Sequence, residues 1–354
     1  MDETRRSFLE ELLSASTPSG FETEGQRRWL EYVSPFADET RVDAYGNAVA
    51  VHEGADGAPS VAVAGHGDEI GLMVRAVTDD GFLKLTRIGG SDRTVTRGQH
   101  VTVHTDEGPV AGVIGQVAIH LRDTGADEYD EIAEQHVDIG VENGDRAREL
   151  VDVGDPITLD TAVTELADGR LAARGLDNRV GVWTAAEAFR RAVEADPDVT
   201  VYAVSTVQEE VGLRGAQMVG FELDPDAVVA VDVTHATDQP ESPGGKGSDI
   251  ELGAGPVVPR GSANHPALVD AVRAVAADSG VEVQLAAAGS GTGTDADAFY
   301  TSRGGTPALN LGIPNRYMHT PVEVVDLADL EVAAELLADT AARLGEFDPL
   351  DAGL

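Results

Sequence analysis

A small set of polar residues stands at, inside or just beyond short apolar runs of the chain, where metal chemistry can be organised. Its members are His66, Asp68, Asp177, Glu209, Glu210, Asp232 and His319. The sequence contains no cysteine, so a metal ion must be held by histidine, aspartate or glutamate. Histidine with carboxylate is a ligand set that suits borderline divalent ions. The set therefore predicts a divalent metal site.

Asp232 carries the strongest individual signal, because it interrupts the otherwise apolar run Ala227–Val233. An unpaired buried carboxylate costs several kcal/mol, so this side chain needs an ionic partner or a metal. Each of the others has a simpler alternative when taken alone. Asp177 can be a helix N-cap, the Glu209–Glu210 pair can be solvated, and a single histidine is more often structural than a ligand.

The set as a whole favours two ions rather than one. Two histidines and several carboxylates at one edge of a sheet allow a carboxylate-bridged pair of ions about 3.5–4 Å apart. A carboxylate that is not needed as a ligand is then free to act as a general base.

An α/β sheet is the element that would bring these residues together. Strands are predicted at Ala48–His52, Val61–Ala64, Val199–Val207, Ala227–Val233, Val281–Ala286 and Pro307–Leu311. Helices are predicted within Ser7–Val33, interrupted at Thr17–Gly20, and over Asn178–Ala195, Pro266–Ser279 and Leu327–Leu344. This alternation predicts a mainly parallel sheet with helices on both faces. Functional residues then gather at the carboxyl ends of the strands.

Residues 72–165 have a different pattern, with short alternating runs separated by glycine and aspartate. The runs are Phe82–Thr86, His100–His104, Pro109–Ile114 and Ile157–Leu159. A charged stretch at Glu142–Leu150, before the last of these runs, is predicted to be helical. We therefore predict a small β-rich domain over 72–165, inserted into an α/β domain made of 1–71 and 166–354.

The formal net charge of −38 over 354 residues excludes the basic footprint that nucleic-acid binding needs. An acidic surface can recruit basic partners or reflect adaptation to high salt. Only Lys84 and Lys246 are lysine, and this depletion along the whole chain favours a halophilic origin. No apolar run is long enough for a membrane span and the N-terminus has no signal-peptide pattern, so we expect a cytoplasmic protein.

Six motifs give the sequence a resemblance to a known family. They are Gly65–Gly71, Gly175–Arg179, Gln208–Ala216, Val231–Thr234, Gly293–Ala296 and Arg316–Glu323. In this order they resemble the tetrahedral (TET) aminopeptidases, a di-metal family that includes glutamyl and deblocking aminopeptidases. The resemblance extends from about Leu12 to Leu344. It implies a di-metal exopeptidase fold in which 72–165 is a PDZ-like dimerisation domain.

The resemblance also implies a role for each member of the set. His66 and Asp232 would be terminal metal ligands, Asp177 would bridge two ions, and Glu210 and His319 would complete the ligand sets. Glu209 would be the general base for a metal-bridging water, and Asp68 would orient His66. The peptide bond between Asp177 and Asn178 would be cis. The ions would be zinc or cobalt, with manganese also accepted.

The activity implied is removal of N-terminal residues from peptides, by dimers that assemble into a twelve-subunit shell. A related carboxypeptidase or amino-acid deacylase uses a similar ligand set. The early position of the inserted domain, before Asp177, and the Arg316–Glu323 motif argue against it. A non-catalytic relative would have lost Glu209 or a ligand, and here all are present.

Overall fold

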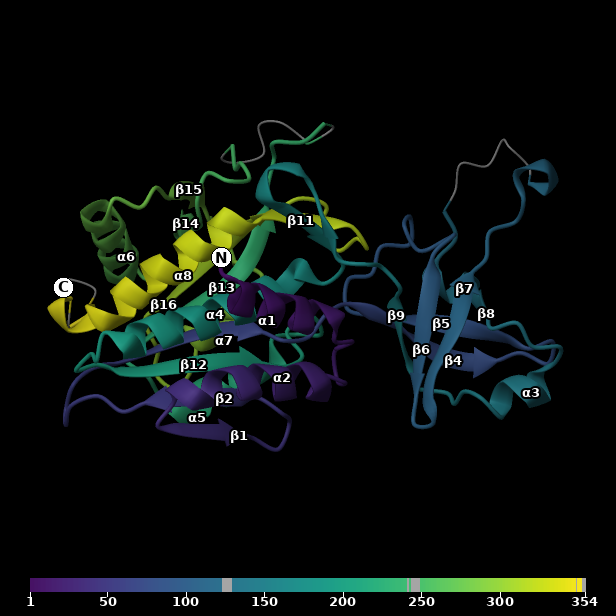
Figure 1. Cartoon of the computed structure of the whole chain (residues 1–354), viewed down its shortest axis with the longest axis horizontal. Helices are drawn as coiled ribbons and strands as arrows, with labels where there is room; N and C mark the ends of the chain where they lie inside the picture. Colours follow the sequence, from purple (N-terminus) through teal and green to yellow (C-terminus); the bar gives the residue numbers. More distant parts are fainter. Residues whose placement is uncertain (123–128, 241, 243–248, 348, 352–354) are drawn as a thin grey trace.

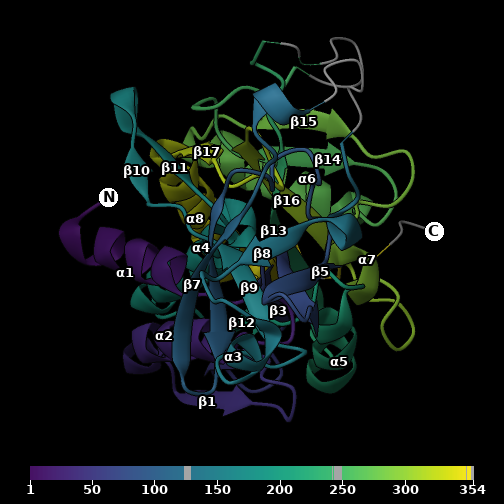
Figure 2. The ribbon, with the colours of Figure 1, turned by 90° about the vertical axis from the view of Figure 1, so that its right-hand side faces the viewer.

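The computed structural model describes residues 1–122, 129–240, 242, 249–347 and 349–351. It shows an open α/β sheet on one side and a closed β-barrel on the other (Figure 1). In Figure 2, which is turned by 90°, the barrel strands lie in front of the sheet. None of the described helices is long and apolar enough to cross a membrane.

The main sheet has eight strands. In spatial order they are β1 (Glu39–Val42), β2 (Ala48–His52), β12 (Thr200–Thr206), β3 (Ser60–His66), β13 (Ala227–His235), β16 (Ala308–Asn315), β14 (Val257–Arg260) and β15 (Gln284–Ala287). The central strands β12, β3, β13 and β16 are parallel to their neighbours within this group. Antiparallel pairing is confined to the flanks. The predicted α/β fold is thus confirmed.

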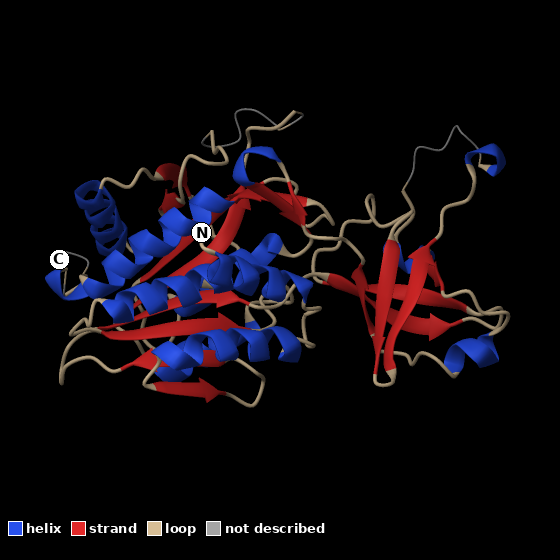
Figure 3. Ribbon diagram, in the orientation of Figure 1, coloured by secondary structure: helices blue, strands red, loops and turns tan. Residues whose placement is uncertain are grey.

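Helices cover both faces of this sheet (Figure 3). One face packs against α1 (Glu3–Ser14), α2 (Thr23–Val33), α4 (Leu176–Glu194), α6 (Pro266–Ser279) and α8 (Leu327–Ala342). The other face packs against α5 (Arg214–Leu223) and α7 (Ala296–Phe299). Because side chains alternate along a strand, each central strand contributes to both cores. Val229 and Val231 face α4, whereas Val228 faces α7.

Two glycines set the distance between β3 and α4. A Cβ atom on Gly65 would come within 2.6 Å of the carbonyl carbon of Gly181, and one on Gly181 would reach the side chain of Asn178. The absence of both side chains lets the first turns of α4 lie directly on the sheet. As a result, Asp177 at the start of α4 lies close to His66 at the end of β3.

The barrel has its own core and lies between the two parts of the α/β domain in sequence. Its strands follow the order β4 (Gly71–Val77), β5 (Phe82–Ile88), β8 (His136–Asp138), β7 (Gly108–Ile114), β6 (His100–Thr105) and β9 (Pro156–Leu159). Leu85, Val103 and Ile157 are fully buried inside it. A short helix, α3 (Gly144–Arg148), covers one side. The predicted barrel-like character of the module is confirmed.

A second, three-stranded sheet connects the barrel to α4 and to the C-terminal part of the chain. It consists of β10 (Thr164–Glu165), β11 (Arg170–Ala173) and β17 (Glu323–Asp326). Short 3-10 turns complete the described elements: η1 (Ser34–Phe36), η2 (Ile119–Leu121), η3 (Ile132–Glu134), η4 (Ala167–Gly169) and η5 (Leu344–Glu346). Residues Ala173 and Glu323 are paired, which places β17 beside the segment leading to Asp177.

Several boundaries differ from the sequence prediction. The strand predicted to end at Leu311 continues to Asn315, because β13 remains paired with it as far as His235. The strand predicted at Val281–Ala286 starts only at Gln284. The helix predicted over Glu142–Leu150 is limited to Gly144–Arg148. Helices α5 and α7 and strands β1, β4, β8, β10, β11, β14 and β17 were not predicted. All of them except α5 have seven residues or fewer, which is too short for a clear periodic pattern.

A buried ionic cluster joins the N-terminal segment to α4. The carboxylate of Glu69 pairs with Arg174 and Arg179 and accepts a 3.0 Å hydrogen bond from the backbone N–H of Thr17. Glu69 is 2% exposed and Arg179 is equally buried. Burial alone would raise the pKa of Glu69, but the two guanidinium groups lower it to about 2.

We expect Glu69→Ala to destabilise the protein by about 3–5 kcal/mol, because it leaves two buried arginines without their partner. A carboxylate with a lowered pKa in the folded state stabilises the protein at pH values above its unfolded-state pKa. This stabilisation is lost as the pH falls through the folded-state pKa. The difference between wild type and variant should therefore shrink as the pH drops from about 4.5 toward about 2. Denaturant titrations at several pH values measure this.

The control for this variant is Glu24→Ala, which removes an exposed pair with Arg28 on α2. That change should cost no more than about 0.5 kcal/mol. Equal losses of unfolding free energy in the two variants would show that the buried Glu69 cluster stabilises the protein no more than an exposed ion pair does.

Candidate metal centre

The candidate site lies at the carboxyl ends of the central strands. His66 ends β3, Glu209 and Glu210 follow β12, Asp232 lies near the end of β13, and Asp177 belongs to the first turn of α4. His319 follows β16 in the loop that leads to β17. The structure brings all seven predicted residues together, although they come from five separate segments of the chain. Six line one cavity of about 560 Å³, and Asp68 lies behind it, fully buried.

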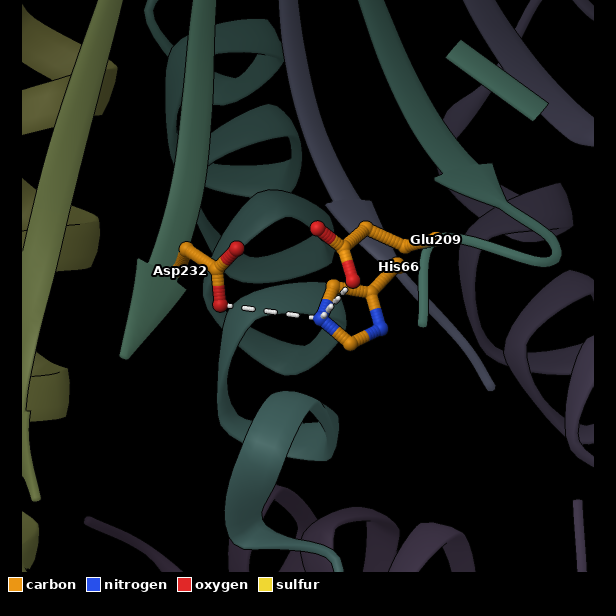
Figure 4. A group of neighbouring side chains, drawn as sticks. All are labelled: His66, Glu209 and Asp232. Atoms are coloured by element: carbon orange, nitrogen blue, oxygen red, sulfur yellow. Dashed lines mark ion pairs between the residues drawn. The ribbon is translucent and has the colours of Figure 1, made fainter. Parts of the chain in front are cut away.

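Three of these side chains form the first group, shown in Figure 4. The Nε2 atom of His66 lies 3.8 Å from Oε2 of Glu209 and 3.6 Å from Oδ1 of Asp232. All three residues are less than 9% exposed. Their ligand atoms lie within 4.8 Å of one another, which is a spacing that allows a single cation to contact several of them.

Asp177 connects this group to a second one. Its Oδ1 atom lies 3.2 Å from Nε2 of His66, and its Oδ2 atom lies 3.3 Å from Nε2 of His319. The second group is completed by Glu210, whose Oε1 atom lies 3.5 Å from the same nitrogen of His319. The two oxygens of one carboxylate thus face two different histidines. A carboxylate in this position has the geometry of a bridge between two ions.

The electrostatics of the site fit divalent cations. Burial raises the pKa of Glu209 to about 10 and that of Glu210 to about 7, because the protein supplies too little positive charge for their ionised forms. Burial also raises the pKa of Asp232. The buried Oε1 atom of Glu210 accepts no hydrogen bond. Bound cations would compensate these carboxylates, so the donor set matches a metal centre.

Asp68 holds two parts of the site together. Its Oδ1 atom lies 3.3 Å from Nδ1 of His66 and accepts a 2.9 Å hydrogen bond from the backbone N–H of Glu209. Its Oδ2 atom accepts hydrogen bonds from Ser19 and from the backbone N–H of Glu210. Burial alone would raise the pKa of Asp68, but the hydrogen bond with His66 contributes most to lowering it. A carboxylate on the far ring nitrogen orients a metal-binding histidine.

Glu323 connects two backbone segments in the other half of the site, and it was not predicted to be a site residue. It is 1% exposed, and its Oε2 atom accepts a 2.8 Å hydrogen bond from the backbone N–H of Asp177. Its Oε1 atom accepts a 3.2 Å hydrogen bond from the backbone N–H of His319. The only signal in the sequence was its place at the end of the Arg316–Glu323 motif.

Two further residues complete the surroundings. The peptide bond from Asp177 to Asn178 is cis, as the family resemblance implied. The side chain of Asn178 donates a 2.8 Å hydrogen bond to the carbonyl of Val231, which ties the start of α4 to β13. Asp295, in another of the six motifs, is buried and accepts a hydrogen bond from Thr206. Burial raises its pKa to about 7.

Comparisons with known proteins give the relatives of this chain. The family model described as M42 glutamyl aminopeptidase matches residues 46–336. A lysyl aminopeptidase of Pyrococcus furiosus is 34% identical over 352 residues, covering 97% of this chain and 98% of the relative. An aminopeptidase from the archaeon Desulfurococcus kamchatkensis has a TM-score of 0.91 at 33% identity, with 99% of each chain covered. The TET1 peptidase of Pyrococcus horikoshii, described as assembling into a tetrahedron or a large octahedral shell, has a TM-score of 0.85 at 31% identity, covering 95% of this chain and 99% of that one.

We expect Glu323→Gln to weaken metal binding by roughly 10–100-fold, as loss of an outer partner of a metal site typically does. A glutamine has one acceptor oxygen, so its amide N–H₂ would face the backbone N–H of either Asp177 or His319. Competition with a chelating dye measures the affinity. Glu53→Gln, at an exposed position beyond β2, is the control and should leave the affinity unchanged. Equal affinities in all three proteins would contradict the positioning role.

Proposed function

This chain is an aminopeptidase of the M42 glutamyl aminopeptidase family, and we propose that it removes N-terminal residues from peptides with two divalent ions and Glu209 as the general base. The observation that carries the two-ion proposal is the carboxylate of Asp177, whose two oxygens face His66 and His319. His66 and Asp232 would bind one ion, and Glu210 and His319 the other, with Asp177 between them. Zinc or cobalt suits these ligands best, and manganese is also accepted.

The bound ions would lower the pKa of a bridging water and polarise the scissile carbonyl. Glu209 would take the proton from the attacking water; in support, its carboxylate lies at the cavity wall, 3.8 Å from the ring of His66. It would then return the proton to the departing amine. Asp68 contacts both the backbone N–H of Glu209 and the ring of His66, so it would hold the proposed base and the proposed ligand at a fixed relative position.

We also propose that the barrel, with domain limits 72–165, mediates dimerisation and that dimers assemble into a dodecameric shell in the cytoplasm. Support comes from exposed apolar side chains in the described part of this module: Val117, Ile119, Leu121 and Tyr129 are between 53% and 79% exposed. Exposed apolar side chains this close together in the sequence favour an interaction surface. The tetrahedral assembly described for the TET1 peptidase is consistent with this arrangement.

The function is tested by hydrolysis of aminoacyl p-nitroanilides after removal of metal by a chelator and return of Zn²⁺, Co²⁺ or Mn²⁺. We expect activity to disappear and to return, and Glu209→Gln to lower kcat by about 10²–10⁴-fold as expected for loss of a general base. Metal content, measured by elemental analysis, should remain two ions in this variant. Full activity with metal bound would exclude Glu209 as the base.

The same assay distinguishes the aminopeptidase function from the nearest alternative, a related deacylase or carboxypeptidase. Cleavage of N-acyl amino acids or of C-terminal residues, without turnover of any free-amine substrate, would contradict an aminopeptidase and indicate a deacylase or carboxypeptidase instead.

The acidic, lysine-poor composition supports the proposal that the protein works at high salt. Screening shortens the range of charge repulsion from about 10 Å at 0.1 M salt to about 3 Å at 1 M. We expect the melting temperature to rise by roughly 5–10 °C between these salt concentrations, equivalent to about 4–7 kcal/mol for a chain of 354 residues. Sucrose at matched osmolality is the control, since it screens no charge. A melting temperature that falls or stays constant with KCl would contradict salt adaptation.

A further inference from the structure

One residue of the metal-site cavity has hydrogen-bonding capacity that the fold does not use. Asn310 lies on β16 and is only 7% exposed, yet its Oδ1 atom has no hydrogen-bond partner. Its backbone N–H donates a 2.7 Å hydrogen bond to Oδ1 of Asn264, so the backbone position is fixed. A buried polar group without a partner costs about 1–3 kcal/mol.

The position of Asn310 on the sheet places its side chain below the metal site. Gly312, two residues further along β16, is paired with Asp232 on β13. Side chains at i and i+2 share a face, so Asn310 lies on the same face as Asp232, roughly 7 Å deeper along the strand. On that face the preceding residue, Ala308, is buried in the apolar cluster with Phe299 of α7. Asn310 therefore marks the point where the apolar face becomes the wall of the cavity.

Among the residues that the structure describes, the remaining cavity walls offer no charge to pair with a charged substrate side chain. Apart from the metal-site residues and the exposed His235, the cavity is lined by uncharged residues. The hydroxyls of Thr292 and Thr294 hydrogen-bond to each other, so their capacity is already used. A lysine or glutamate side chain would thus be desolvated here without a counter-ion, which costs several kcal/mol.

We propose that Asn310 is a specificity-determining residue and that it favours an uncharged first side chain able to hydrogen-bond its amide, of the size and chemistry of glutamine. This inference rests on the proposed aminopeptidase function, because the substrate's first residue must lie next to the ions. An aliphatic side chain such as leucine leaves the amide unpaired, whereas a glutamine side chain satisfies it. First-residue preference differs among relatives: the family model is described as glutamyl and one relative as lysyl.

The test compares kcat/KM for the glutamine, leucine, glutamate and lysine p-nitroanilides in metal-loaded protein. Wild type should cleave the glutamine substrate best. Asn310→Leu should lower the glutamine-to-leucine ratio by at least about tenfold, since one hydrogen bond to the amide is lost. Asn310→Asp, which keeps the shape and adds a charge, should raise the lysine-to-leucine ratio by a similar factor.

The matched control is Asn143→Leu, which removes the N-cap of α3 in the barrel and should leave every ratio unchanged. A merely structural role for Asn310 would lower kcat/KM for all substrates alike. That result, or a wild-type enzyme that prefers leucine, lysine or glutamate, would overturn the proposal.

Binding of the free amino acids separates this inference from the proposed function. Calorimetry on the metal-loaded wild type should show tighter binding of glutamine than of leucine, and it needs neither turnover nor a folded variant. Equal or weaker glutamine binding would overturn the role of Asn310. Absence of anilide hydrolysis, with glutamine still preferred in calorimetry, would count against the aminopeptidase function alone.

Discussion

The concentration of carboxylates at one end of the sheet is the constraint on which the rest of this structure depends. Asp177, Glu209, Glu210 and Asp232 converge with only His66 and His319 to balance them. Among the described residues that line the cavity, no lysine or arginine relieves this repulsion. Hydrogen bonds from His319 and His66 hold the pKa of Asp177 low although burial would raise it, whereas burial raises the pKa of Glu209 and Glu210. Divalent cations held by these side chains would resolve this imbalance.

Such a cluster persists only if the backbone cannot relax away from it. Two buried carboxylates that bind no metal in our assignment provide that restraint. Asp68 joins the end of β3 to the Glu209–Glu210 segment, and Glu323 joins the start of α4 to the His319 loop. Both oxygens of each carboxylate accept hydrogen bonds from backbone N–H groups, and such a buried carboxylate costs less than one without partners. The positions of the candidate metal-binding side chains therefore depend on hydrogen bonds between several segments at this edge of the sheet.

The seven site residues were predictable from the sequence because each lies in a local pattern. Asp232 interrupts an apolar strand, and Glu209 and Glu210 directly follow one. The α/β fold followed from the same runs. Glu323 and Asn310 could not be recognised in this way, because their roles arise from tertiary contacts: β17 lies beside β11 only in the folded chain, and the unpaired amide of Asn310 is visible only when its surroundings are known. Helix α5 was missed because it begins inside the Gln208–Ala216 motif and contains Gly215 and Gly220, which lower its helix propensity.

The barrel is connected to the candidate site both along the chain and through a direct contact. It enters the chain just after Asp68 and returns before Asp177, so both of its connections lead to the site. At its own edge Gly90 lies against His319, where a Cβ atom would come within 2.7 Å of Nδ1. His319 is the most exposed of the candidate ligands, with 36% of its side chain accessible, and this contact limits the positions its ring can take. A shift of the barrel would therefore press on the ring of this candidate ligand, because the close-packed contact leaves no free space between them.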